Sequence, residues 1–61
     1  MNYVESKIAE RNRWDRKQDG RTYIIRRIDG NRITLERQSA AFGTPDITVT
    51  RAELLRRYEP A

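Results

Sequence analysis

The strongest constraint on the fold of this chain is a pair of β-rich runs on either side of one tight turn. Residues 21–28 and 32–38 are rich in β-branched and aromatic side chains, which favour strands. Between them lies Asp29-Gly30-Asn31, a turn sequence in which glycine accepts a positive φ at little cost. The pattern predicts a β-hairpin.

The alternation within the hairpin also predicts a defect in its first strand. Tyr23 and Ile25 alternate onto one face, but Ile28 falls out of phase by one residue. A β-bulge at Arg26-Arg27 would return Ile28 to that face. Ile24 then points to the other face, either beneath an N-terminal helix or toward a partner.

The segments before the hairpin predict a helix and a strand. Asn2 and Glu5 have the spacing of a capping box, and Val4 and Ile8 share one helical face, so we expect a helix over residues 1–12. Residues 13–17, around Trp14, are interpreted as a strand that ends at an Asp-Gly turn. The alternative is that the helix continues through Trp14.

The segments after the hairpin predict a loop, a short strand and a second helix. Gly43 and Pro45 break regular structure within residues 39–46, and residues 47–50 are rich in β-branched side chains. Thr50 and Glu53 form a second capping box, which opens a helix expected over residues 51–59.

The fold class is therefore mainly β, of the α+β type, as a single small domain over residues 1–61. Antiparallel strands over residues 13–50 form a small curved sheet or barrel, closed by the two terminal helices. The residues expected in the core are Val4, Ile8, Trp14, Tyr23, Ile25, Ile28, Ile33, Leu35, Ile47, Val49, Leu54, Leu55 and Tyr58.

Residues 13–61 resemble the SH3-like small β-barrels. The resemblance lies in a tryptophan-bearing strand, a Tyr-x-Ile hairpin, the short strand 47–50, a helical segment and Tyr58. The basic C-terminal domains of retroviral-type integrases are one such group, and the resemblance implies a barrel that binds DNA. The chain departs from the pattern in its extra N-terminal helix, its longer helix 51–57 and a fifth strand confined to residues 58–61. An open sheet packed by helices is therefore the alternative.

The composition argues against catalysis. The chain has no cysteine and no histidine, which excludes disulfides and a Cys/His zinc site and removes the most common nucleophiles and general bases. The carboxylates lie beside arginines in turns and strands, and no glycine-rich phosphate loop is present. We expect a non-enzymatic protein without a metal or other cofactor.

The same sequence predicts a cytoplasmic location without membrane contact. The N-terminus lacks the basic and apolar regions of a signal peptide. No segment approaches the ~20 apolar residues that span a bilayer.

Charge gives the main functional hypothesis. The chain carries 13 basic and 9 acidic residues, for a net charge of +4, and eleven of the basic residues are arginine. Arginine binds phosphates and carboxylates through paired hydrogen bonds, although genomic codon bias and solubility also explain the enrichment. We expect a regulatory or accessory nucleic-acid-binding module, with DNA preferred over RNA. Its expected phosphate contacts are Arg13, Arg16, Lys17, Arg26, Arg27 and Arg32. Trp14 and Tyr23 could stack on bases if exposed; the alternative is that both belong to the core.

Protein binding is the alternative hypothesis, because arginine and exposed apolar anchors are also typical of protein interfaces. Ile24 and Phe42 are the candidate anchors, for an acidic protein surface. An inhibitor or adaptor encoded by a phage or mobile element fits this description. An open sheet edge would also allow a homodimer. Arg56 and Arg57, at the end of the second helix, are sufficiently explained by the helix dipole.

Overall fold

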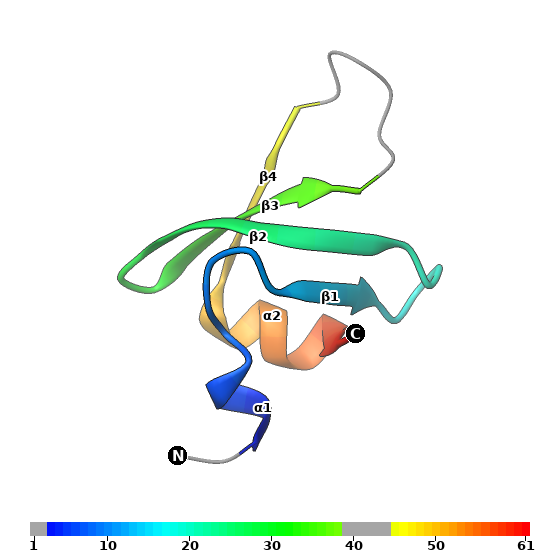
Figure 1. The fold of residues 1–61 in the computed structure, drawn as a ribbon, viewed down its shortest axis with the longest axis horizontal. Coiled ribbons are helices and arrows are strands. Elements are labelled where there is room, and N and C mark those ends of the chain that lie inside the picture. The colour runs from blue at the N-terminus through cyan, green and yellow to red at the C-terminus, as the bar shows by residue number, and fades with distance from the viewer. Residues whose placement is uncertain (1–2, 39–44) are drawn as a thin grey trace.

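Residues 3–38 and 45–61, which the computed structural model describes, form an antiparallel sheet of five strands that curls around its core, with two short helices (Figure 1). The strands lie in the order β4-β3-β2-β1-β5. Their bounds are β1 Arg13–Arg16, β2 Thr22–Asp29, β3 Arg32–Arg37, β4 Ile47–Thr50 and β5 Tyr58–Pro60, and the helices are α1 Tyr3–Ser6 and α2 Arg51–Arg57. The mainly β fold class is therefore confirmed.

The predicted hairpin forms β2 and β3, and the predicted bulge lies within it. The register of the pair shifts between Ile25 and Arg27, and Ile28 then lies opposite Ile33. The extra residue leaves Arg26 and Arg27 facing Thr34 together. Bulges increase the local twist of a sheet, which suits the curl of this one.

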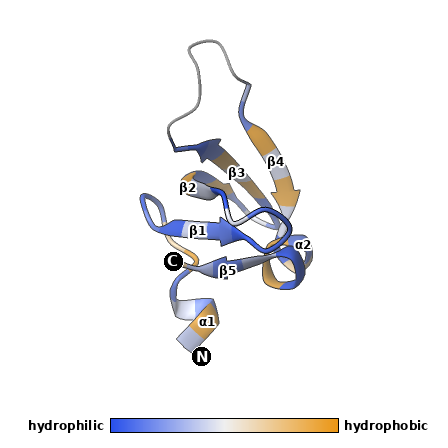
Figure 2. Ribbon diagram, turned by 90° about the vertical axis from the view of Figure 1, so that its right-hand side faces the viewer, coloured by the Kyte–Doolittle hydropathy of each residue, from blue (hydrophilic) through white to orange (hydrophobic). Residues whose placement is uncertain are grey.

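The concave face of the sheet encloses the core. Its buried residues are Trp14, Tyr23, Ile25, Ile33, Leu35, Val49, Leu54 and Tyr58, and the residues packed at its margin are Ile8, Ile28, Ile47 and Leu55. Twelve of the thirteen predicted core residues therefore lie in or against the core. Figure 2 shows the hydrophobic segments on β3, β4 and α2, while β1 is largely hydrophilic. Trp14 is the residue of β1 that is buried in the core.

The predicted N-terminal helix is much shorter than residues 1–12. Helix α1 ends at Ser6, and the carbonyl of Lys7 accepts hydrogen bonds from Trp14 Nε1 at 3.0 Å and Asn12 Nδ2 at 2.9 Å. These bonds hold the chain in a turn that leads into β1, with Arg11 at a φ of 73°. Val4 is consequently 37% exposed, so its assignment to the core was wrong. The capping residue Asn2 lies outside the described residues.

The second helix begins where predicted but ends earlier. The Thr50 side chain accepts a hydrogen bond from the Glu53 N–H at 3.1 Å, which confirms Thr50 as the N-cap of the helix. The helix ends at Arg57 instead of residue 59, because Tyr58 adopts an extended conformation and begins β5 beside β1. This short fifth strand makes the sheet a curled half-barrel, which is compatible with an SH3-like fold.

Candidate functional site

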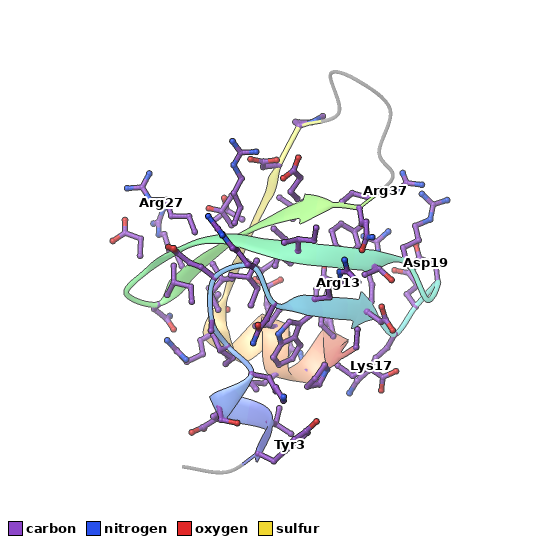
Figure 3. The ribbon with its side chains drawn as sticks, in the orientation of Figure 1. Tyr3, Arg13, Lys17, Asp19, Arg27 and Arg37 are labelled. Atoms are coloured by element: carbon purple, nitrogen blue, oxygen red, sulfur yellow. The ribbon has the colours of Figure 1, made fainter. Side chains whose placement is uncertain are left out.

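One end of the sheet gathers cations from three distant parts of the chain; we call it the basic end. It comprises Arg16, Lys17, Arg21, Arg37, Arg56 and Arg57, with the acids Asp19 and Glu53. The β1–β2 turn is tied to the end of α2 by a hydrogen bond of 2.9 Å from the Lys17 N–H to the Arg57 carbonyl. Across the sheet, Arg16 pairs with Tyr58 and Tyr23 pairs with Arg37. Figure 3 shows Lys17, Asp19 and Arg37 at this end, opposite Arg27.

The basic end carries an excess of positive charge. Its six cations outnumber Asp19 and Glu53, and they still outnumber the acids when the adjacent pair of Asp15 and Glu59 is counted with them. Summed charge over a surface, rather than the number of arginines, sets its attraction for an anionic ligand.

Arg16 is fixed in place within the basic end. Its Nε and Nη2 donate to the two carboxylate oxygens of Asp19 at 3.2 and 2.6 Å, and its guanidinium lies 5.1 Å from the centre of the Tyr23 ring. The hydrogen bond from Arg16 lowers the pKa of Asp19 to about 2 and raises the pKa of Arg16. Arg21 also approaches Asp19, with 3.3 Å between Nε and Oδ2. Asp19 therefore organises two of the cations.

The other four cations of the basic end have no ion pair within residues 3–38 and 45–61. They are Lys17, Arg37, Arg56 and Arg57. Arg37 is half-buried, and the other three are exposed. Glu53 is three and four residues from Arg56 and Arg57 on α2 but forms no salt bridge with either one. These cations are available to an external anion.

A groove of about 500 Å³ opens at the basic end, between β4, α2 and the end of β1. Its charged lining is Arg16, Lys17, Arg56, Arg57 and Glu53. Its apolar lining is Ile47, Val49 and Tyr58. The groove therefore combines a cationic rim with an apolar floor.

The convex face of the sheet, which faces away from the core, carries the other predicted arginines. Arg13 alternates with buried Trp14 on β1, and the bulge directs Arg26 and Arg27 to this face. Arg26 is held by carboxylates: Nη1 lies 3.3 Å from Glu36 Oε2, and Nε lies 3.7 Å from Asp46 Oδ2. Charges of both signs therefore alternate over the convex face.

The structure thus divides the six predicted phosphate contacts between two surfaces. Arg16 and Lys17 lie at the basic end, whereas Arg13, Arg26, Arg27 and Arg32 lie on the convex face. The half-buried Ile24 also lies on the convex face, between its neighbours Arg13 and Glu36. Phe42 lies outside the described residues.

The sequence interpretation missed Arg56 and Arg57 as partners of Arg16 and Lys17. The sequence feature that could have revealed them is the fifth strand expected at residues 58–61. Pairing of that strand with β1 brings the end of α2 to the β1–β2 turn. Trp14 is 0% and Tyr23 is 2% exposed, so both belong to the core and neither can stack on a base.

Comparison with known proteins adds no assignment: no protein-family model, curated protein or solved structure matches this chain. Within the described part of the chain, no helix is both long enough and apolar enough to cross a membrane. Residues 3–38 and 45–61 also contain no group of three or more acidic side chains that could hold a metal ion.

Proposed function

We propose that this protein is a non-enzymatic nucleic-acid-binding module, with a regulatory or accessory role, that holds a phosphate backbone at its basic end. The observation that carries the proposal is the charge distribution: cations outnumber acids at this end, and four of its cations lack an ion pair among the described residues. Cations without partners bind phosphates and release the condensed counterions of the nucleic acid.

The burial of the aromatic side chains bears on which nucleic acid is bound. Binding of single strands relies on aromatic rings that stack on bases. Trp14, Tyr23 and Tyr58 are at most 4% exposed. Tyr3 is 70% exposed but lies on α1, apart from the basic end (Figure 3), and Phe42 is outside the described residues. Phosphate contacts without stacking favour a duplex, and we propose duplex DNA as the preferred ligand.

The resemblance to SH3-like barrels agrees with this proposal. The basic C-terminal domains of retroviral-type integrases, which share the strand pattern, bind DNA. This support is an analogy of fold, and it transfers no residue to the site. The assignment to the basic end rests on the charges of this chain alone.

The proposal is tested by binding to labelled duplex DNA, single-stranded DNA and RNA at about 50 and 200 mM salt. We expect micromolar or tighter binding of the duplex at the lower salt, with a steep loss at the higher salt. Weaker binding of the single strands would support a site without stacking. If no nucleic acid binds at the lower salt, the proposal fails.

A second candidate function is protein binding through the convex face, where Ile24 is partly exposed between Arg13 and Glu36. An apolar residue among balanced charges is typical of a protein interface. An inhibitor or adaptor would use this face, and Ile24→Ser would then abolish capture of its partner without loss of the fold. If Ile24→Ser leaves such a complex intact, the convex face is not its interface.

A further inference from the structure

Strand β4 has one unpaired edge, and that edge borders the groove. Among the residues that the structure describes, β4 is the last strand of the sheet and pairs only with β3. Ile47 and Val49 of β4 line one side of the groove, and residues of α2, β5 and the β1–β2 turn line the other. The curled sheet is therefore open along the side where another strand would close it.

The register of β4 determines which of its backbone groups point out of the sheet. The Arg51 N–H donates to the Asn31 carbonyl at 3.0 Å, so the flanking pair of Thr50 and Arg32 is not hydrogen bonded. Because antiparallel pairs alternate, Thr48 and Thr34 also form a pair without hydrogen bonds. The N–H and C=O of Thr48 consequently point to the open side of β4.

The groove combines these backbone groups with two kinds of side chain. Its floor is apolar, formed by Ile47, Val49 and Tyr58. Its rim carries four cations and a single acid, Glu53. A ligand that matches all three features is an extended chain with apolar and acidic side chains, because only such a chain supplies main-chain partners for Thr48.

We propose that this groove binds an extended acidic segment of a partner protein, which adds to the sheet as a strand along the open edge of β4. The segment would exchange main-chain hydrogen bonds with Thr48, place apolar side chains against Ile47 and Val49, and direct carboxylates to the cations of the rim. This inference goes beyond nucleic-acid binding, since it assigns the groove at the basic end a peptide ligand.

A second copy of this chain is a poorer match, because its own edge strand, Ile-Thr-Val-Thr, carries no carboxylate for the cations of the rim. A nucleic acid duplex could meet the cations of the rim through its phosphates, but it supplies no apolar side chain for Ile47 and Val49 and no strand to pair with the N–H and C=O of Thr48.

The proposal is tested with synthetic peptides of about six residues, long enough to span the four residues of β4. The probe alternates glutamate and valine. One control alternates glutamate and serine, another alternates lysine and valine, and a third is the probe with all of its backbone N–H groups methylated. We expect the probe to bind and each control to bind at least about tenfold more weakly, because each lacks one of the three matched features. Equal binding of the N-methylated peptide would exclude strand addition, and no binding of the probe would exclude the peptide site.

A protein variant separates this site from the phosphate site. Thr48→Pro removes the outward N–H, and proline is tolerated on an edge strand. We expect Thr48→Pro to weaken the probe about tenfold or more while duplex DNA binding is unchanged, since phosphates do not need this N–H. A thermal unfolding curve verifies the fold of the variant. If Thr48→Pro does not fold, binding of the N-methylated peptide to the parent protein decides whether a strand is added. Loss of DNA binding in a folded Thr48→Pro, with the probe unaffected, would assign the groove to nucleic acid.

Discussion

The convex face and the basic end both carry several arginines, but they differ in what surrounds them. On the convex face, Arg26 lies between two carboxylates, and Arg32 lies opposite Asp29. At the basic end, the sheet pairing brings α2 to the β1–β2 turn, and the cations of both outnumber the acids nearby. The number of arginines in a strand therefore does not give the local charge. The register of the sheet decides which charges are neighbours.

The largest expected effect is the removal of two cations from α2. Arg56→Gln/Arg57→Gln should weaken duplex DNA binding about tenfold or more at low salt and reduce the magnitude of the salt slope by about 2, because each phosphate contact contributes close to one unit. Fluorescence anisotropy across a salt series measures both quantities.

Arg27→Gln/Arg32→Gln is the matched control, because it removes the same charge from the convex face. We expect the affinity of this variant for duplex DNA to fall much less. The lower net charge weakens the general attraction of the protein for DNA, but no phosphate contact is lost. A larger loss in this variant than in the α2 variant would assign the phosphate contacts to the convex face and reverse the comparison.

The next effect concerns the stability of the helix that carries these cations. Thr50→Ala removes the side-chain cap of α2 and should lower the free energy of unfolding by about 1 kcal/mol. Thr48→Ala, two residues earlier on the same strand, removes no cap and should cost less. Urea unfolding of both variants measures the difference, and equal losses would show that the cap does not stabilise α2.

A smaller effect of opposite sign is expected at Glu53, which is one of the two acids of the basic end and forms no salt bridge within the described residues. Glu53→Gln should tighten duplex DNA binding about twofold, because it removes a charge that repels phosphate. The gain should disappear at high salt. Weaker binding by Glu53→Gln would show that the carboxylate orients a cation of the site.

The smallest effect is a pH dependence of stability. The pKa of Asp19 is about 2 in the folded protein, below its usual value of about 3.9 in an unfolded chain. Its contribution is therefore fully present above about pH 4 and is lost as the pH falls toward 2. Asp19→Asn should melt with a flatter pH dependence in that window than the parent protein. Parallel curves would show that the Arg16–Asp19 pair is not formed in solution.

The sequence predicted the local features of this fold well. The hairpin, its bulge and the cap at Thr50 each depend on a few neighbouring residues, and all three are confirmed. The length of the N-terminal helix was wrong, because it is ended by bonds to the Lys7 carbonyl that include one from Trp14, seven residues away.

The candidate site was less predictable, because it depends on contacts between distant residues. Arg16 and Arg57 are far apart in the chain and meet only through the pairing of β5 with β1. Without that pairing, the helix dipole is a sufficient explanation for Arg57 at the end of a helix. Likewise, the carboxylates that neutralise Arg26 come from β3 and from the residue just before β4, and sequence spacing does not reveal them.

The most direct test is a titration of the isotope-labelled protein with a short DNA duplex, followed through its backbone amide signals in NMR spectra. We predict that the amides of Lys17, Arg37 and Arg57 shift, while those of Arg13, Ile24 and Arg27 stay in place. Shifts confined to the second group would place the nucleic acid on the convex face and contradict the assignment of phosphate binding to the basic end.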